Sequence, residues 1–429
     1  MFINCSVVEQ YMDTSDVFEE WNIYSKKKAL RTREVDFDSI KRNSEFKIIA
    51  ITGIRRAGKS SMLMLLSQKL AEDNAKVSYL NVEDSRIKGR KDVLEDTIKW
   101  FGDDGFLLID EITSANDWQG WLARTHELLK GKLRLIVSSS RKSLVLPNKP
   151  LRGRMLPFEM YPLSFKEFLA FKIVTPEKTT AGRGRIEKEF AEYLRYGGFP
   201  EVALTKEEMD KVSILGSYFK DILGLDVAEL SGEDVSTVEA FGKYVIQSPY
   251  FSASKCLNFF KTLGYKIGKE KILKLEKHSQ MGYLFFFLPI FSYNIKDKSQ
   301  YPRKAYCGDN GFSYAITGKM DFGRLFENLV FLELKRRTQG QSEICYWKNK
   351  EGLETDFIVM RGTRVSEAIQ VVYDMDDEKT KKREVNGLLE CIKELKPEKA
   401  VIITKDVSEV MTIEGIKIKF VPIVDWLLG

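Results

Sequence analysis

A basic segment with two glycines, GIRRAGKSS, holds residue types that bind phosphate at a characteristic spacing. Gly53 and Gly58 flank four residues, and Lys59 and Ser60 follow directly. Glycines let the backbone wrap closely, so that its N–H groups point at phosphate oxygens. A lysine places an ammonium group against the β- and γ-phosphates, and a serine hydroxyl is a ligand for Mg²⁺. The spacing therefore predicts a loop that binds ATP together with Mg²⁺.

The predicted nucleotide site also includes Ala57 and Ser61, because successive backbone N–H groups of such a loop face the ligand. An apolar strand precedes the loop and an amphipathic helix follows it. This context argues against a chance match to a glycine-containing basic turn. The positive N-terminal end of the helix adds to the attraction for phosphate. ATP and Mg²⁺ are therefore the predicted cofactors.

Two acidic residues end the apolar run FLLIDEI, residues 106–112. A carboxylate at the C-terminal end of a parallel strand lies beside the phosphate loop in a doubly wound sheet. We expect Asp110 to hold Mg²⁺ through water and Glu111 to orient or deprotonate the attacking water. The alternative is a strand that merely ends in solvated acids. The phosphate loop about 50 residues upstream makes the catalytic interpretation the stronger one.

A third apolar run, RLIVSSS, ends in Ser138, Ser139 and Ser140. A polar side chain at this strand end would contact the γ-phosphate or the attacking water, and Ser139 is the predicted contact. Serine also caps helices, and this alternative stays open at the level of sequence.

Short apolar segments that alternate with amphipathic helices must position these residues. Such runs are typical of buried parallel strands. The predicted strands are 47–52, 76–82, 105–112 and 134–140, and one predicted helix is 60–70. Strand–helix alternation favours a doubly wound α/β domain. Further along, the pattern predicts helix 322–336, strands 345–348, 355–360 and 365–373, helix 376–395 and strand 401–404, which together form a second α/β domain.

Composition indicates an ordinary globular chain. Of its 429 residues, 43% are hydrophobic and 30% charged, and the net charge of +6 permits contact with nucleic acid without arguing for it. Five scattered cysteines and two histidines form no zinc-binding pattern. The N-terminus lacks the pattern of a secretory signal, and the most apolar run, 283–291, is too short to cross a bilayer. A cytoplasmic protein that does not contact membranes is predicted.

The order of several motifs resembles a known family. Besides the three segments above, these are LRGRMLPFEMYPLSFKEFL, YGGFPEV, KAYCGDNGF, FENLVFLEL and ETDFIV, from residue 151 to residue 359. Together they resemble the AAA-type ATPases common in archaea and bacteria. Those proteins carry a helical, winged-helix-like middle region and a C-terminal domain related to restriction endonucleases.

The resemblance implies an α/β protein with a P-loop NTPase domain built on a parallel sheet, a winged-helix-like middle, and a C-terminal α/β domain like restriction endonucleases. The expected division is an N-terminal adapter segment (1–44), a P-loop ATPase core (45–172), a helical lid (173–232), a winged-helix-like region (233–300) and a restriction-endonuclease-like domain (301–429).

The resemblance also suggests roles for arginines. Arg152 and Arg154 would supply an arginine finger, in cis or from a neighbouring subunit. The alternative is a surface arginine paired with a carboxylate. Of the loop arginines, Arg55 and Arg56, one would pack against the protein while the other faces nucleotide, and Arg56 is included in the predicted nucleotide site. The paired glycines of YGGFPEV predict a structural turn.

Residues 252–280 read as helix, turn and helix, as in a helix-turn-helix. Lys266, Lys269, Lys271 and Lys274 would then lie on or near the recognition helix and contact DNA phosphates without reading sequence. A packing module with a solvated basic face is the alternative.

The C-terminal domain departs from the pattern of a working nuclease. Glu327 and Asp356 fit two of the metal ligands of such enzymes, but Gln370 and Val372 stand where an acid and a lysine are expected. Glu367 faces the opposite side of the strand by alternation. Because the activating cation is missing from the strand, we expect no DNA cleavage. The domain would serve as a docking or dimerisation surface, with Glu327 and Asp356 as hydrogen-bond acceptors.

The leading interpretation is an ATPase that hydrolyses ATP to ADP and phosphate and acts as a nucleotide-driven switch on DNA or a protein partner. Two alternatives stay open: an ATP-gated DNA nuclease, and a nucleotide-binding scaffold with little hydrolysis. The candidate partners are ATP and ADP, non-specific DNA, a protein and further copies of the chain. A ring assembly would follow by analogy alone.

Overall fold

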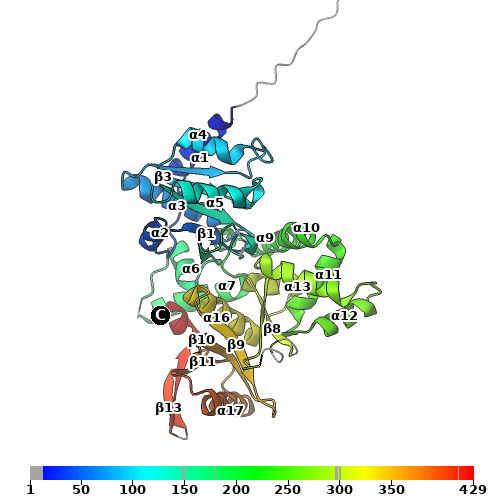
Figure 1. Ribbon diagram of the computed structural model, residues 1–429. Coiled ribbons are helices and arrows are strands. Elements are labelled where there is room, and N and C mark those ends of the chain that lie inside the picture. The colour runs from blue at the N-terminus through cyan, green and yellow to red at the C-terminus, as the bar shows by residue number, and fades with distance from the viewer. Residues whose placement is uncertain (1–12, 147–149, 178, 295–297, 299–300, 414) are drawn as a thin grey trace, which may run out of the picture. The chain divides into compact units, whose positions relative to one another are not determined.

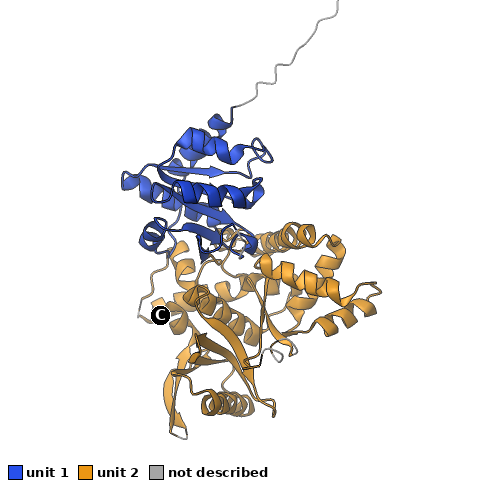
Figure 2. Ribbon diagram, viewed as in Figure 1, with its two compact units in different colours: residues 1–52, 58–158 blue, residues 53–57, 159–429 orange. Residues whose placement is uncertain are grey.

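The structure is a computed structural model of the 429-residue chain, and it describes residues 13–146, 150–177, 179–294, 298, 301–413 and 415–429. The chain forms two compact units (Figure 2). Unit 1 comprises residues 1–52 and 58–158, and unit 2 comprises residues 53–57 and 159–429. In the part that is described, no helix is both long and apolar enough to span a membrane.

Unit 1 is built on a five-stranded sheet of order β2-β3-β4-β1-β5 (Figure 1). Its strands are β1 (Ile48–Thr52), β2 (Val77–Asn81), β3 (Gly105–Asp110), β4 (Leu133–Ser139) and β5 (Met155–Glu159). The pairs β2–β3, β3–β4 and β4–β1 are parallel. This is the P-loop NTPase fold, and the four predicted apolar strands are confirmed, because strands buried on both faces read as continuous apolar runs.

Helices cover this sheet and complete the core of unit 1. They are α1 (Thr14–Lys27), α2 (Phe37–Asn43), α3 (Lys59–Glu72), α4 (Val93–Phe101) and α5 (Trp118–Leu128), with short 3-10 turns at Ile112–Ser114 and Lys142–Leu144. The predicted helix 60–70 is α3. The first helix belongs to the same core, since Val17 and Phe18 are fully buried against strand residues such as Ile48 and Leu107.

The first part of unit 2 is helical. Its helices are α6 (Phe165–Phe171), α7 (Thr180–Tyr196), α8 (Pro200–Leu204), α9 (Glu208–Asp221), the π-helix η3 (Ile222–Ala228), α10 (Glu229–Ser231), α11 (Val235–Gln247), α12 (Ala253–Thr262), α13 (Lys269–Met281) and α15 (Asn310–Thr317). A small sheet of order β6-β8-β7 accompanies them, with strands β6 (Tyr250–Phe251), β7 (Phe285–Leu288) and β8 (Arg303–Cys307). One apolar core, rich in phenylalanine, joins α9, η3, α11, α12 and α13 to the sheet, whereas α6 and most of the buried side chains of α7 belong to a second core.

The C-terminal part of unit 2 is a mixed six-stranded sheet of order β13-β14-β12-β11-β10-β9. Its elements are α16 (Phe322–Thr338), β9 (Glu343–Lys348), β10 (Glu354–Arg361), β11 (Arg364–Val372), α17 (Glu378–Leu395), β12 (Lys399–Thr404), β13 (Glu409–Ile413), β14 (Ile416–Pro422) and α18 (Ile423–Leu428). Strand β10 is antiparallel to β9 and β11, whereas β11, β12 and β14 are parallel.

The predicted helices and strands of this domain are present, with two differences. Helix α17 begins at Glu378 and not at Asp376, because Asp377 is the N-cap and its carboxylate accepts from the N–H groups of Lys379 and Thr380. The prediction also stopped at strand 401–404. Two further strands and a short helix, β13, β14 and α18, follow it.

Candidate functional site

The carboxyl ends of β3 and β4 bring together the polar residues predicted for the nucleotide site. Register pairing places Asp110 at the end of β3 beside β4, which ends at Ser139. The Asp110 carboxylate accepts hydrogen bonds from the hydroxyls of Ser60, Ser138 and Tyr79, the last at 2.9 Å. Ser60 comes from the first turn of α3. The two predicted Mg²⁺ ligands, Ser60 and Asp110, are therefore in direct contact.

Burial gives this carboxylate an unusual electrostatic state. Asp110 is 1% exposed, and burial first, then the neighbouring charge of Glu111, raise its pKa. The hydroxyls of Ser138, Ser60 and Tyr79 oppose that rise. A hydroxyl and a carboxylate side by side offer the hard oxygen ligands that Mg²⁺ prefers, so the residues present fit the predicted metal. A dication there would also favour the ionised form of Asp110.

Glu111 is held in a left-handed backbone conformation immediately after β3, with φ of 50°. Its carboxylate accepts from the backbone N–H of Ser140 at 3.1 Å, and its own N–H donates to Ser138 Oγ at 3.1 Å. Left-handed backbone in a residue other than glycine or asparagine is uncommon and is often found at functional sites. The half-buried carboxylate is thus fixed at the strand end, where a catalytic base was predicted.

Ser139 has two partners of its own. Its Oγ lies 2.8 Å from Thr113 Oγ1, and it accepts from the backbone N–H of Arg141 at 3.1 Å. These bonds tie the end of β4 to the turn after β3 and cap the backbone that follows. The predicted contact of Ser139 with nucleotide stays a prediction.

The second half of the phosphate loop lies in unit 1. Gly58 has φ of 98°, which glycine adopts without strain, and it is the N-cap of α3. Lys59 opens the helix and is 5% exposed, while Ser60 and Ser61 are half-buried. Because a glycine cap contributes no side-chain acceptor, the first N–H groups of α3 can donate hydrogen bonds to a bound anion.

The first half of the loop, residues 53–57, lies in unit 2. Arg55 forms a two-bonded ion pair with Asp226, with Nε–Oδ2 and Nη2–Oδ1 distances of 2.7 and 3.1 Å. Arg56 is exposed, and its guanidinium carbon lies 5.3 Å from the ring centroid of Tyr218. The sequence predicts that one loop arginine packs against the protein. In the structure, Arg55 is the more buried of the two.

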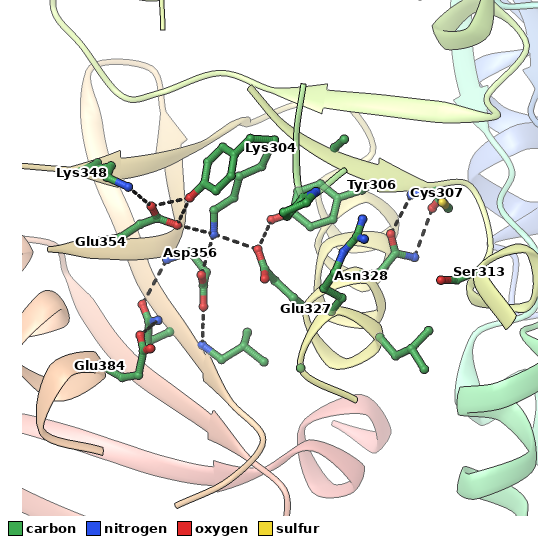
Figure 3. A pocket seen from close by; sticks show the side chains of 18 of the residues that line it. Lys304, Tyr306, Cys307, Ser313, Glu327, Asn328, Lys348, Glu354, Asp356 and Glu384 are labelled. Atoms are coloured by element: carbon green, nitrogen blue, oxygen red, sulfur yellow. Dashed lines mark hydrogen bonds and ion pairs between the residues drawn. The ribbon is translucent and has the colours of Figure 1, made fainter. Parts of the chain in front are cut away.

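A second polar site lies in the C-terminal part of unit 2 and is built around the ammonium group of Lys304 (Figure 3). Lys304 Nζ lies 2.8 Å from Glu327 Oε1, 2.8 Å from Glu354 Oε1 and 2.7 Å from Asp356 Oδ1. Lys304 comes from β8, Glu327 from α16, and the other two from β10. These side chains line a cavity of about 390 Å³.

Further hydrogen bonds hold the carboxylates in place. Asp356 Oδ2 accepts from the backbone N–H of Val371 at 2.8 Å, and the Asp356 N–H donates to Gln370 Oε1 at 3.1 Å. Gln370 Nε2 in turn donates to Glu384 Oε2 at 2.6 Å. Gln370 therefore acts as a bridge between strand and helix, at the position where the endonuclease pattern has an acid.

Two tyrosines complete the cluster. The hydroxyl of Tyr306 donates to Glu327 at 2.5 Å, and that of Tyr250 donates to Glu354. Neither tyrosine was predicted from the sequence, nor was the role of Lys304 or Glu354. The motifs KAYCGDNGF and ETDFIV contain three of the four, but their pairing depends on tertiary structure.

The expectation that this site lacks a cation is wrong. Val372, at the position of the expected lysine, is buried in the apolar core. Lys304 supplies the positive charge from a different strand, β8. Burial alone would lower the pKa of Lys304, but the carboxylates of Asp356 and Glu327 outweigh it and raise that pKa. Burial also raises the pKa of Asp356. The ammonium group of Lys304 opposes this rise, and the carboxylate of Glu327 adds to it.

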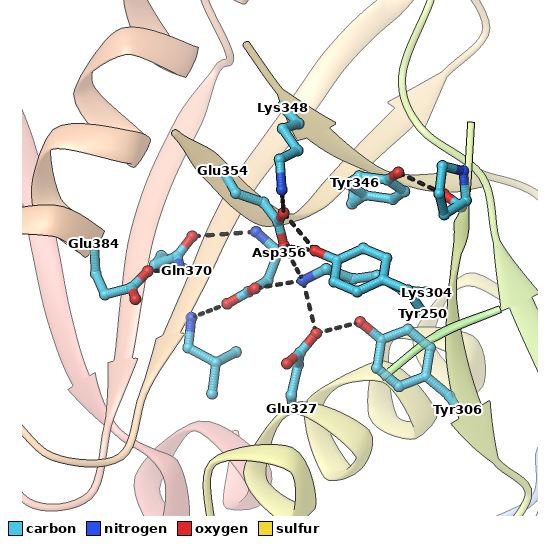
Figure 4. Close-up of polar contacts among 12 residues, drawn as sticks. Tyr250, Lys304, Tyr306, Glu327, Tyr346, Lys348, Glu354, Asp356, Gln370 and Glu384 are labelled. Atoms are coloured by element: carbon cyan, nitrogen blue, oxygen red, sulfur yellow. Dashed lines mark hydrogen bonds and ion pairs between the residues drawn. The ribbon is translucent and has the colours of Figure 1, made fainter. Parts of the chain in front are cut away.

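The same geometry disfavours a metal ion. Figure 4 shows Lys304 at the centre of the group, where the oxygens of Glu327, Glu354 and Asp356 converge. Among the described residues, no group of three or more histidine, cysteine, aspartate or glutamate side chains is arranged to hold a metal. The lysine takes the place that a divalent cation would need.

Comparison with known proteins agrees with the fold. Residues 45–169 match the family model described as an AAA domain. Residues 187–322 and 322–426 match two models described as domains of unknown function. An uncharacterized protein of Methanocaldococcus jannaschii is 31% identical over 399 residues, which cover 91% of this chain and 88% of that protein.

The chain belongs to the family of this archaeal protein, and it carries an AAA-type domain. An uncharacterized protein of Haemophilus influenzae is 27% identical over 413 residues, covering 89% of this chain and 94% of the relative. Among solved structures, AMPPCP-bound DnaA from Aquifex aeolicus matches at a TM-score of 0.25 and 14% identity, covering 57% of this chain and 86% of that one. At that TM-score the likeness carries no argument about function.

The predicted finger arginines of the AAA-type domain lie before β5. Arg154 donates to Glu127 Oε2 at 3.0 Å and to the carbonyl of Pro150 at 3.0 Å, and its side chain is 37% exposed. Arg152 is exposed. Within the chain, Arg154 thus makes the surface pair that was the alternative interpretation. Its action as an arginine finger stays a prediction.

The lysines predicted to contact DNA are all exposed, on α13 or in the turn before it. They are Lys266, Lys269, Lys271 and Lys274. Helix α13 buries Ile272 and Leu275 on its other side. Lys271 pairs with Glu233 Oε2 at 2.8 Å, which offsets part of the basic charge. The likeness of this region to a winged helix stays a prediction.

The turn predicted at YGGFPEV is present, and it adjoins the GDNGF segment of the chain. Gly197 has φ of 75°, and a Cβ atom there would lie 1.6 Å from Asp309 Oδ1. Asp309 accepts from the N–H groups of Gly198 and Gly311, both at 2.8 Å. Burial raises the pKa of Asp309 to about 7 despite these two bonds. The paired glycines therefore allow a buried carboxyl group to approach the turn.

Proposed function

We propose that the chain binds ATP with Mg²⁺ at the phosphate loop and hydrolyses it to ADP and phosphate. The observation that carries the proposal is the contact between the hydroxyl of Ser60 and the carboxylate of Asp110, with Glu111 fixed at the same strand end. An AAA-type domain and a P-loop NTPase fold support it.

Each residue has a role that follows from its position. The N–H groups that follow Gly58 bind phosphate oxygens, and the Lys59 ammonium stabilises charge on the β- and γ-phosphates. Ser60 and Asp110 hold the metal. When bound, Mg²⁺ neutralises charge that builds on the transferring phosphoryl group. Glu111 accepts the proton of the attacking water, and the N–H of Ser140 keeps its carboxylate in place.

Calorimetry with MgATP tests the binding step. Lys59→Ala is expected to abolish measurable affinity while the fold is kept, because the loop lysine acts on phosphate and not on the apolar core. Lys69→Ala is the matched control, since Lys69 is an exposed lysine in the last turn of the same helix. It should bind like the parent. Unchanged affinity in Lys59→Ala would contradict the site.

We further propose that nucleotide turnover drives a switch that acts on DNA or on a protein partner through the helical part of unit 2. The exposed lysines of α13 support contact with phosphates. The ATPase rate measured with and without duplex DNA separates this role from a scaffold with little hydrolysis. A scaffold would show no turnover in either case.

The alternative of an ATP-gated nuclease is less well supported by the pocket. Its carboxylates are already neutralised in part by Lys304, and Gln370 and Val372 give neither a further acid nor a second lysine. We therefore still expect no cleavage of DNA. The ammonium group of Lys304 already pairs with the carboxylates that a catalytic metal would need.

A further inference from the structure

The first five residues of the phosphate loop, residues 53–57, belong to unit 2. Ile54 and Ala57 are fully buried in the apolar core of the helical part. Gly53 leaves no room for a side chain, because a Cβ atom there would lie 1.9 Å from the carbonyl oxygen of Met160. A change in the backbone of this segment therefore also displaces the side chains and backbone that pack against it.

The pair of Arg55 and Asp226 is a polar anchor of the segment. Both guanidinium–carboxylate bonds are present, at 2.7 and 3.1 Å, and the side chain of Asp226 is 0% exposed. A planar guanidinium that makes two parallel bonds fixes direction as well as distance. Removing either partner alone would leave a charge that is hard to solvate.

Asp226 lies in the π-helix η3, between α9 and α10. π-Helical segments are rare and frequently occur at functional sites. This one packs against α11 and α13. At the end of α13, a Cβ atom on Gly282 would lie 3.1 Å from Cβ of Asp226, so the backbone of that helix end touches the aspartate directly. One residue thus contacts both the phosphate loop and the helix that carries the exposed lysines.

We propose that Arg55 and Asp226 form the coupling contact by which nucleotide in the phosphate loop changes the stability of the π-helix and the end of α13. The proposal rests on ATP binding at the loop. A triphosphate brings negative charge to the segment that holds Arg55, and it competes with Asp226 for the guanidinium. ATP therefore weakens the pair and loosens η3. By linkage, a ligand that orders α13 and η3 lowers the affinity for ATP by the same factor.

Hydrogen exchange of the full chain, with and without Mg²⁺ and the ATP analogue AMPPNP, measures this coupling. In the parent, amide exchange in Ile222–Ala228 and around Gly282 should become faster by about tenfold on binding, the usual scale of coupling between sites. The double variant Arg55→Gln/Asp226→Asn keeps an amide pair without charge. It should bind the analogue more weakly by calorimetry, because Arg55 no longer attracts phosphate, yet show no such change in η3 when saturated with the analogue.

Controls keep the outcomes distinct. Arg185→Gln removes a surface pair with Glu177 in the same unit and should respond like the parent. If the double variant does not fold, Arg55→Lys decides, because it keeps the charge but loses the two-bonded geometry, and its response should be clearly smaller. A parent-like response in either variant overturns the coupling. So does a parent that binds the analogue without any change in η3. Absence of binding in the parent instead contradicts the proposed ATP site.

Discussion

Replacing Lys304 by methionine tests the polar site of the C-terminal domain most severely. The change removes one ammonium group and leaves three carboxylates, on Glu327, Glu354 and Asp356, whose side chains are 23%, 20% and 9% exposed. Breaking a buried ion pair from one side typically costs about 3–5 kcal/mol. We expect the free energy of unfolding of this domain to fall by about that amount at pH 8.

The effect should depend on pH in a defined direction. Burial raises the pKa of Asp356 in the parent and Lys304 opposes that rise, so removing Lys304 places the folded pKa of Asp356 further above its unfolded pKa. Stability from such groups is present at low pH and is lost as pH rises. The destabilisation by Lys304→Met should therefore be smaller at pH 5 than at pH 8.

Native-state hydrogen exchange of β10 in increasing urea is the assay, because it reports on this domain and not on the rest of the chain. Lys348→Met is the matched control. Lys348 also pairs with Glu354, at 3.0 Å, but its side chain is 39% exposed, and such pairs contribute about 0–1 kcal/mol. If Lys304→Met lowers the free energy of unfolding at pH 8 by no more than Lys348→Met does, Lys304 does not stabilise this site as an ion pair.

Three further predictions concern the lysines of α13, the buried Asp309 and the absence of DNA cleavage at the polar site around Lys304. Replacing Lys269, Lys271 and Lys274 together by glutamine should flatten the salt dependence of DNA binding, measured by fluorescence anisotropy, since fewer counterions are released; an unchanged slope places the contact elsewhere. Because the folded pKa of Asp309 is raised to about 7, the parent should lose about 3 kcal/mol of stability relative to Asp309→Asn between pH 5 and pH 8, measured by urea unfolding, and a difference that stays constant with pH contradicts this assignment. Linear and circular DNA should stay intact on gels with Mg²⁺ or Mn²⁺, with or without ATP; cleavage that disappears in Asp356→Ala would show a working nuclease.

The fold of unit 1 could be predicted because its sequence patterns are local. The strands of unit 1 are continuous apolar runs, and the phosphate loop needs its residue types at fixed spacing. Asp110 and Glu111 follow from their position at the end of β3, and the structure places them beside Ser60 and Ser140 as that position implies.

The polar pocket was not predictable in the same way. Lys304 lies 52 residues before Asp356 in the chain and reaches it only when β8 packs beside α16 and β10. The strands β13 and β14 were missed for a different reason. Residues of β13 are exposed or half-buried, so their apolar positions form no clear alternation, whereas β14 does alternate, with Ile418 and Phe420 buried, and was overlooked. The ion pair of Arg55 with Asp226 spans 171 positions and has no local signal.

Phosphate release by the parent and by Glu111→Gln at saturating MgATP shows whether the chain hydrolyses ATP with Glu111 as its base. The substitution keeps the shape of the side chain and removes the base. We expect Mg²⁺-dependent phosphate release by the parent. In Glu111→Gln the rate should be about 10²-fold lower, with ATP still bound. Turnover by Glu111→Gln at the parental rate, or a parent that binds MgATP and releases no phosphate, would contradict this expectation.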